Sequence, residues 1–507
     1  MGYPVPHDLP ASNLADLLKI ERLPLIVDRQ PFRQLEYIRG YAEDLGCTAV
    51  LVESDYIDRD YMQDHSAFYA SSFANYGFKC RRLHFFSDLK STEVIDALNG
   101  VATSMTKGKA GYDTACREFS EKHYQGFAVI KPLPGSPVGR TILRTYPAEP
   151  TGEDYLRRFE AVRDYSVHLL GAELTIRGLG FQQQDQGVSA CATTAIWTSI
   201  QKLRDFEDVA AATPAQITAS ASRFALPFGR SLPSEGLSLD QMCQGIHALG
   251  VSPNLVRIES FRHARSMIFA AAISGIAPIL IIRSPKGSRH AVSAAGIKVR
   301  KNHQATIIAG VNAIDDMSGD LLGVYIHDDR IGPYVRTKFE EQDVKGEKVP
   351  CLVIREDRAD VCWTITHLLM PVHGKIRTGV SQMLRFSTKF ARFAYVYLSA
   401  LGMAKKPVQM LTRISRAHRY VEELLTDIEE VGSARITEFF QNVQLSRYVG
   451  VTSLNHPDAG RFDVLVDSTG TERNSHCLAI VCRGKASAQS ANFLSAFGKY
   501  FKCVAVK

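Results

Sequence analysis

The middle of the chain keeps its helical patterns apart from its strand patterns. One helix is expected to begin at Cys191, a second to end at Gly250 and a third to end at Gly275. Strand candidates follow, first a run of Ile and Leu after Pro278 and then the segments 289–299, 304–314 and 321–334. Because no strand–helix–strand repeat is visible, this region is predicted to be α+β, a helical half followed by an antiparallel sheet.

The chain of 507 residues is too long for one compact domain. Turn residues near 150 and a change of pattern near 375 divide it. We expect a mixed α/β domain of unknown role at 1–150, the middle domain at 151–375, and an α+β domain with basic helices at 376–507. Flanking strands are expected at 47–54, 78–86, 124–134, 461–470 and 476–484, and a closing helix at 487–501.

The ten cysteines are scattered along the chain without any CxxC pair. This spacing argues against a zinc site and a disulfide framework, and it favours a reducing compartment. The first ten residues lack the basic region and apolar core of a secretory signal. No window approaches the roughly 18 apolar residues of a membrane span. We therefore expect a cytoplasmic protein without a transmembrane segment, a metal or a cofactor.

The formal net charge of +7 is unevenly distributed. The segment 371–420 holds ten Lys or Arg residues and no Asp or Glu. We interpret it first as a helical hairpin outside the core that does no chemistry, with a solvated basic face and an apolar face carrying Phe386, Phe390, Phe393 and Val396. The alternative is a docking surface for an acidic partner, nucleic acid or membrane headgroups, although no nucleic-acid motif supports it.

Three carboxylates, Asp58, Asp60 and Asp64, cluster in a segment of the first domain whose Tyr and Phe residues recur at helical spacing. Such a cluster is compatible with a metal site. Carboxylates on the solvent-facing side of a helix are the commoner case, and we expect that arrangement here.

The junction "FQQQDQGVSACATTAIWTSIQKL" at 181–203 places a cysteine at the start of a helix. A cysteine nucleophile acts as a thiolate, and the unpaired N–H groups and dipole of a first helical turn stabilise an anion there. A side-chain donor upstream can complete an oxyanion hole with the backbone N–H of Cys191, and the candidates are Gln184 and Gln186. A lone cysteine in this position is more commonly a buried apolar residue.

A general base and a group that orients it are the further requirements of this chemistry. His290 is the candidate base, because it opens a strand directly after a glycine turn. Asp328 ends a later strand and is the candidate orienting residue. Strand alternation implies that only one of Asp328 and Asp329 reaches the ring, and we expect it to be Asp328. The order Cys191, His290, Asp328 points to thiol chemistry.

The region of about 180–335 resembles the papain-like cysteine peptidase fold, and within it the bacteriocin-leader-processing branch most. The resemblance rests on a Gln before the Cys at a helix start, then "GLSLDQMCQGIHALG", "SGIAPILII", a His-led strand and a strand ending before "GP". It implies Cys191 as nucleophile, His290 as base, Asp328 as orienting residue and a Gln as oxyanion donor. This covers about a third of the chain.

The sequence departs from that pattern at several positions. The family's Gln six residues before the cysteine is replaced by Asp185, with Gln184 and Gln186 on either side. Gln186 is favoured because Gly187 follows it, and Gln184 stays open. The other departures are Ala192 after the cysteine, Arg289 before the histidine, and Asp329 after the aspartate.

The leading hypothesis is a cysteine peptidase that cleaves a peptide or isopeptide bond through a thioester. A second enzymatic alternative uses the same triad as an acyltransferase, a transglutaminase-like enzyme or an amidase. A third alternative is a non-catalytic, papain-like binding module. The complete Cys, His and Asp set argues against the third alternative, because a binding module has no chemical need for all three.

Overall fold

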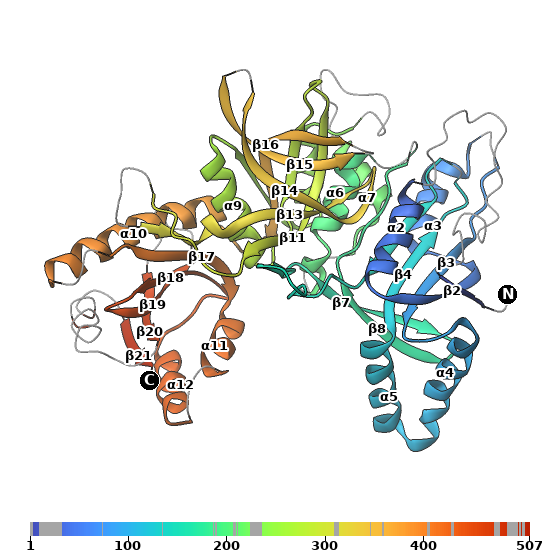
Figure 1. Ribbon diagram of the computed structural model, residues 1–507, viewed down its shortest axis with the longest axis horizontal. Coiled ribbons are helices and arrows are strands. Elements are labelled where there is room, and N and C mark those ends of the chain that lie inside the picture. The colour runs from blue at the N-terminus through green and yellow to red at the C-terminus, as the bar shows by residue number, and fades with distance from the viewer. Residues whose placement is uncertain are drawn as a thin grey trace.

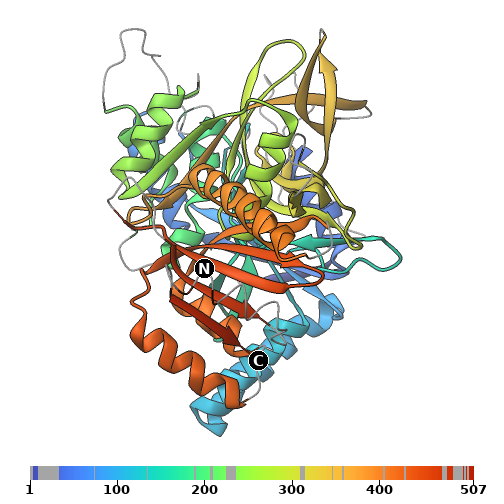
Figure 2. The same cartoon turned by 90° about the vertical axis from the view of Figure 1, so that its left-hand side faces the viewer.

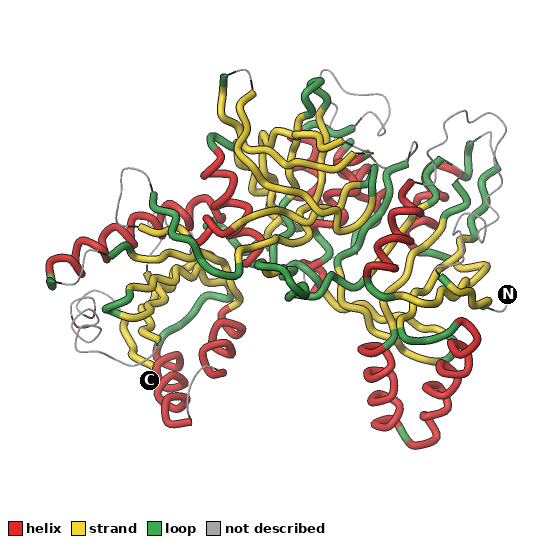
Figure 3. Tube along the Cα trace, in the orientation of Figure 1, coloured by secondary structure: helices red, strands yellow, loops and turns green. Residues whose placement is uncertain are grey.

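A computed structural model of the chain shows a mixed α+β protein, which confirms the predicted class at this level (Figures 1 and 3). Its described part contains eleven α-helices and several sheets, one of them closed into a barrel. The structure describes residues 4–9, 33–72, 75–133, 135–185, 187, 190–205, 209, 211–223, 236–308, 314–344, 346–356, 359–402, 406–426, 430–470, 477–483, 495, 498 and 502–506.

The N-terminal sheet has five antiparallel strands in chain order. They are β1 (Val5–Asp8), β2 (Cys47–Tyr56), β3 (Cys80–Ser87), β4 (Tyr124–Ile130) and β5 (Val138–Leu143). The helices of this part are α2 (Arg33–Asp44), α3 (Arg59–Asp64), α4 (Ser91–Thr103) and α5 (Lys109–Lys122). Val50 packs with the α2 side and Leu51 with the α4 and α5 side, which explains why β2 is apolar at consecutive positions.

The first core continues past residue 150. A hairpin of β7 (Arg163–Leu169) and β8 (Ala172–Gly178) packs on α5, and its apolar residues belong to the same cluster as those of α4 and α5. The turn between the two strands is Leu170–Gly171, where both residues have positive φ (48° and 82°). Two-residue turns of this kind match the twist of a hairpin.

Six antiparallel strands of the middle region close into a barrel, since the last of them pairs with the first. They are β10 (Ile279–Arg283), β11 (Arg289–Arg300), β13 (Leu321–Asp328), β14 (Gly332–Val344), β15 (Glu347–Glu356) and β16 (Ala359–His373). Two further strands extend it, β9 (Val251–Arg257) beside β16 and β6 (Tyr155–Arg158) beside β11. The core contains Leu280, Val292 and Leu368, and α9 (Phe261–Ile273) packs against it.

The helical half consists of α6 (Cys191–Ser199), α7 (Pro214–Ala221) and α8 (Leu239–Ala248). Ile196 and Trp197 of α6 lie in one apolar cluster with Ile281 of β10 and Ala291 of β11. The helices therefore pack on the outer face of the barrel. The predicted order of a helical half before a strand half is confirmed, and Gly250 and Gly275 both have positive φ (76° and 71°) just beyond α8 and α9.

One predicted strand of the middle region is wrong over 304–308, which lie outside the named strands. In the segment 304–314 only Ile314 lies in a strand, β12 (Ile314–Asp316), and 309–313 fall outside the described residues. The short strand β12 pairs in parallel with β17 (Val408–Arg416) of the C-terminal sheet. Its hydrogen-bonding partner lies almost a hundred residues away, and local periodicity carries no signal for such a pairing.

The C-terminal sheet runs in the order β12, β17, β18, β19, β20, β21. Its remaining elements are β18 (Tyr448–His456), β19 (Gly460–Asp467), β20 (Cys477–Arg483), β21 (Lys502–Val506), α10 (Val380–Ala400), α11 (Ala417–Thr426) and α12 (Glu430–Asn442). Figure 2 shows α10 lying across these strands. The predicted closing helix at 487–501 lies outside the described residues except for 495 and 498.

The basic segment is not a helical hairpin, because β17 separates α10 from α11. The predicted apolar face of α10 is also wrong in part, since Phe393 is 55% exposed and Val396 is 61% exposed. The helix buries small and mixed residues instead, namely Val380, Met383, Ser387, Ala391, Ala394 and Leu398. Among the described residues, no helix combines the length and the apolar character needed to cross a membrane.

Candidate active site

Cys191 is the first residue of α6 and is half-buried, whereas the next eight residues of the helix are all buried. Ala190 caps the helix with extended backbone, and its carbonyl accepts the Thr194 N–H at 3.1 Å. Ser293 of β11 fixes the helix on the barrel by donating its hydroxyl to the Ala195 carbonyl at 2.9 Å. The thiol therefore lies at the N-terminal end of a helix that is anchored on the barrel.

The approach to Cys191 is bound to the N-terminal sheet. Phe181 pairs with Thr141 of β5, and the side chain of Gln183 accepts the Val138 N–H at 3.0 Å. Gly180 is required here, because a Cβ would lie 2.7 Å from the Trp197 ring. The glutamine-rich segment thus continues the edge of the N-terminal sheet up to the active-site helix.

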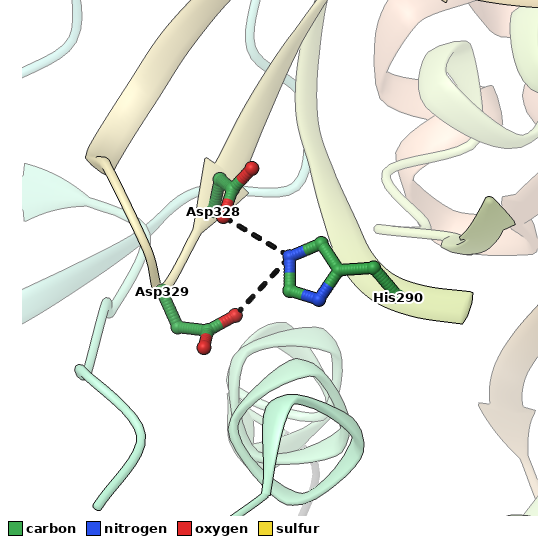
Figure 4. A group of neighbouring side chains, drawn as sticks. All are labelled: His290, Asp328 and Asp329. Atoms are coloured by element: carbon green, nitrogen blue, oxygen red, sulfur yellow. Dashed lines mark hydrogen bonds and ion pairs between the residues drawn. The ribbon is translucent and has the colours of Figure 1, made fainter. Parts of the chain in front are cut away.

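His290 of β11 lies beside Cys191, close enough for the thiol to contribute, after Asp328 and Asp329, to raising the pKa of the ring. The ring Nε2 is 3.0 Å from Asp328 Oδ1 and 3.5 Å from Asp329 Oδ1 (Figure 4). Because both carboxylates face Nε2, the ring nitrogen left for the thiol is Nδ1. The structure thus brings the three residues Cys191, His290 and Asp328 together.

The expectation that only one of the two aspartates reaches the ring is wrong. Asp328 makes the shorter contact, as predicted, but Asp329 also lies against Nε2 (Figure 4). The reason is that β13 ends at Asp328, and Asp329 already belongs to the turn. Side-chain alternation applies within a strand and does not extend into the turn that follows.

Arg330 completes the site and was not found from the sequence. Its Nε donates to Asp328 Oδ1 at 3.0 Å, and its terminal nitrogen donates to Asp328 Oδ2 at 2.6 Å. The same terminal nitrogen is 3.1 Å from Glu356 Oε1, and the guanidinium lies 4.6 Å from the centre of the Trp363 ring. This two-point grip fixes the plane of the Asp328 carboxylate. An Arg within a turn gives no sequence signal of such a role.

The contacts of His290 Nε2 decide its protonation. Arg330 Nε is 3.1 Å from Nε2, and Nε2 cannot donate to Asp328 and accept from Arg330 at the same time. Arg330 Nε already has an acceptor in Asp328, and two carboxylates face the ring. We therefore place a proton on Nε2 that is donated to Asp328.

Charge and burial act in opposite directions on this group. Burial alone would lower the pKa of His290, but the charges of Asp328 and Asp329 outweigh it and raise the pKa well above its ordinary value. Burial would raise the pKa of Asp328, but His290 and Arg330 hold it far below its usual range. Burial, helped by the Asp328 charge, raises the pKa of Asp329. The arrangement favours an imidazolium paired with a carboxylate.

The two predicted oxyanion donors, Gln184 and Gln186, stay predictions. Gln186 lies outside the described residues, and Gln184 is exposed. The buried glutamines of the segment have structural partners, since Gln182 Nε2 donates to Asp60 Oδ2 at 3.1 Å and Gln183 binds β5. The predicted oxyanion hole combined a glutamine side chain with the backbone N–H of Cys191. Of these two donors, the structure describes the backbone N–H, at the N-terminus of α6.

The carboxylates of α3 are buried, so the expectation that they face solvent is wrong. Asp60 Oδ2 also accepts the Trp197 indole N–H at 3.1 Å, and Asp64 accepts the Ala215 N–H at 3.0 Å. Asp58 caps α3 and pairs with Arg140 at 2.8 Å. Their helical spacing serves a contact with α6 and α7 of the helical half.

A metal ion is the other group that this site could hold. His290, Asp328 and Asp329 offer three ligand atoms within 4.8 Å of one another. The Arg330 guanidinium already supplies positive charge to both oxygens of Asp328. The geometry therefore fits a carboxylate that orients a histidine better than a cation site.

Comparison with known proteins adds no assignment, because no family model and no curated protein matches this chain.

Proposed function

We propose that the protein is a thiol-dependent hydrolase of the cysteine peptidase type, with a papain-like arrangement of a helical half on a barrel. The observation that carries the proposal is the grouping of Cys191, His290 and Asp328, in which the thiol lies beside the ring and Asp328 holds the ring Nε2 at 3.0 Å. A structural cysteine has no need of a buried imidazole whose other nitrogen is held by a carboxylate. That combination is the arrangement that activates a thiol nucleophile.

The proposed reaction has two halves. The Cys191 thiolate attacks the substrate carbonyl carbon, the C–N bond breaks, and the imidazolium of His290 gives its proton to the leaving amine. A thioester between Cys191 and the acyl group remains. Neutral His290 then takes a proton from water, the hydroxide attacks the thioester, and the C–S bond breaks. The products are a carboxylic acid, which releases its proton to solvent, and the regenerated thiolate–imidazolium pair.

The surrounding residues have separate roles in this scheme. Asp328, gripped by Arg330, holds His290 in the orientation that directs Nδ1 at the sulfur. The backbone N–H of Cys191, at the N-terminus of α6, faces the charge that develops on the carbonyl oxygen. Arg330, Glu356 and Trp363 act through Asp328 and are positioning residues.

Selective alkylation of the ten cysteines tests the proposal. The full-length protein is treated with substoichiometric iodoacetamide at pH 6, and the labelled sites are mapped by mass spectrometry. We expect Cys191 to react at least about tenfold faster than Cys243, a half-buried cysteine of α8, because an imidazolium stabilises the thiolate. The substitution His290→Ala should abolish this advantage.

A second measurement examines turnover. The protein is incubated with a mixed peptide library, and the products are identified by mass spectrometry beside a Cys191→Ser control. Cleavage that is lost in the control supports the proposal. Equal alkylation of Cys191 and Cys243 together with no Cys191-dependent product would overturn it in favour of a binding module.

A further inference from the structure

Two arginines face each other across the hairpin that carries His290. Arg283 of β10 and Arg289 of β11 are directly opposed in the register, and both are exposed. Side chains in such pairs start about 5 Å apart, and like charges there destabilise the sheet. Neither arginine forms an ion pair with any residue that the structure describes. Within the part of the chain that the structure describes, these two adjacent cations therefore have no carboxylate partner.

This arginine pair lies at the Cys191 end of the site. Alternation along the strands puts Arg283 on the same face as Ile281 and Arg289 on the same face as Ala291. Ile281 and Ala291 are the residues that pack against α6. Ser293 of β11 contacts Ala195 and Ser199 of the helix, and Cys191 lies near His290, so the N-terminal end of the helix lies at the Arg289 end of β11. The two cations therefore lie on the face of the hairpin that packs against α6, at the end of β11 that carries His290.

The positive charge continues across the sheet. The register places His367 of β16 opposite Ile281 and Arg257 of β9 opposite His367, so the three form one row. Burial and the charges of both Arg257 and Arg289 lower the pKa of His367. The positive charges of Arg257 and Arg289 therefore both act on the His367 ring. His367 thus lies between the arginine pair of the hairpin and Arg257 of β9.

Arg257 also lines a cavity of about 1280 Å³ between β9, α9 and α10. Four more exposed cations line it: Arg262, Arg377, Arg385 and Lys389. The acidic lining residues are Glu259 and Asp316, and Asp316 accepts the Ser266 hydroxyl at 2.8 Å. Among the described strands β9 pairs only with β16, so it forms an edge of the sheet.

We propose that the protein binds an acidic peptide segment in extended form, which occupies this cavity along β9 and enters the Cys191 site past Arg257, Arg283 and Arg289. The proposal deepens the proposed function and rests on it, since it names the substrate class of that site. Charge complementarity with five lining cations favours an acidic ligand. A peptide fits better than a nucleic acid, because no Phe, Tyr or Trp among the described lining residues offers a stacking surface for bases.

Binding is measured by fluorescence anisotropy with the full-length Cys191→Ala protein, so that turnover does not interfere. The probes are a labelled dodecapeptide rich in Glu, the same peptide with Gln in place of Glu, and a dodecathymidine. We expect the Glu peptide to bind about tenfold more tightly than the Gln peptide, and this difference to shrink as salt rises.

Two variants locate the binding surface. The triple substitution Arg257→Gln, Arg283→Gln, Arg289→Gln should weaken binding of the Glu peptide about tenfold. The pair Arg257→Gln, Arg262→Gln, which leaves the His290 hairpin intact, should weaken it severalfold. The matched control substitutes three exposed cations of the β14–β15 hairpin, Lys338→Gln, Lys348→Gln and Arg355→Gln, and should change binding less than twofold.

The outcomes separate this inference from the proposed function. Equal binding of the Glu and Gln peptides, an equal effect of the control triple, or preferred binding of the dodecathymidine would overturn the acidic-peptide assignment. Library cleavage without enrichment of Asp or Glu near the cleaved bond would also overturn it while leaving the peptidase proposal intact. Selective binding of the Glu peptide, with neither Cys191-dependent cleavage nor faster alkylation of Cys191 than of Cys243, would overturn the peptidase proposal. An acidic-peptide binding site would then remain.

Discussion

Trp197, in the middle of the helix that begins at Cys191, donates its indole N–H to Asp60 of the N-terminal unit, with 3.1 Å between Nε1 and Oδ2. The same oxygen accepts the Gln182 side chain at 3.1 Å, in the segment that leads to Cys191. One buried carboxylate therefore ties both the approach and the helix of the nucleophile to α3. The N-terminal unit is part of what positions the thiol.

The first prediction follows from this contact. Asp60→Ala leaves the N–H groups of Trp197 and Gln182 buried without an acceptor, which costs on the order of 3 kcal/mol of unfolding free energy. Asp60→Asn keeps an acceptor oxygen and should lose much less. Denaturant unfolding measures both, and the Cys191 alkylation rate shows whether the helix stays in place. Equal stability of the Ala and Asn variants would contradict the proposed role of the acceptor.

The second prediction concerns pH. Burial raises the pKa of Asp64 to about 8, although Lys131 opposes the shift. Between an unfolded pKa of about 4 and this folded value, the folded protein holds a proton that the unfolded chain has released. This group therefore makes the unfolding free energy fall as pH rises from about 4 to about 8, by about 1.4 kcal/mol for each unit of difference.

Asp64→Asn tests this by removing the titration while keeping the acceptor for the Ala215 N–H. We expect the stability of the variant, measured by urea unfolding from pH 5 to pH 8, to depend less on pH than that of the wild type. The variant should be the more stable protein at pH 8. A parallel pH dependence of the two proteins would show that Asp64 is ionised throughout.

The third prediction separates the two aspartates at His290. Asp328→Ala removes the 3.0 Å partner of Nε2 and should slow Cys191 alkylation at pH 6 by about a hundredfold. Asp329→Ala removes the 3.5 Å contact and should slow it less than about tenfold. Circular dichroism confirms folding of both variants. A larger effect of Asp329 would assign the orienting role to the turn residue.

The fourth prediction concerns Arg330, a positioning residue. With Arg330 present, the pKa of Asp328 lies far below its usual range despite burial, so its stabilising contribution is complete above about pH 4 and lost only in stronger acid. Arg330→Gln removes one source of that shift. The loss of Cys191 alkylation in acid, as Asp328 takes up a proton and releases His290, should then begin at a higher pH than in the wild type. A merely structural role would lower the rate without moving the pH at which this loss begins.

The sequence allowed Cys191, His290 and Asp328 of the candidate site to be predicted, but not the residues that hold them in position. Cys191 and His290 each stand at the start of an element, and Asp328 ends a strand, so motif order places them. Arg330 contacts Asp328 across a turn, and Asp60 contacts Trp197, which is distant in the chain. Local sequence patterns do not encode such contacts. The aspartates at 58, 60 and 64 were assigned to the solvent-facing side of an aromatic helix, and only the helical half packed on them reveals their burial.

The C-terminal region shows the same limit. The alternation of β17 was hidden by its basic residues, because Arg413 and Arg416 suggested a continued basic helix. In α10 the small residues Ala391 and Ala394 are buried while Phe393 is exposed. Close approach of a helix to a sheet favours small residues at the contact, and a pattern based on hydrophobicity alone assigns the larger side chain to the core.

The last prediction is that the basic surface of α10 takes no part in the chemistry. Arg392 is exposed on α10, and Lys406, also exposed, forms only a 3.4 Å surface pair with Asp458. Exposed pairs of this kind contribute about 0–1 kcal/mol. Arg392→Glu with Lys406→Glu should therefore leave both the unfolding free energy and the Cys191 alkylation rate nearly unchanged. A folded double variant whose alkylation rate falls tenfold would show that this surface is coupled to the site, whereas weaker acidic-peptide binding with a normal alkylation rate would extend the ligand surface along α10.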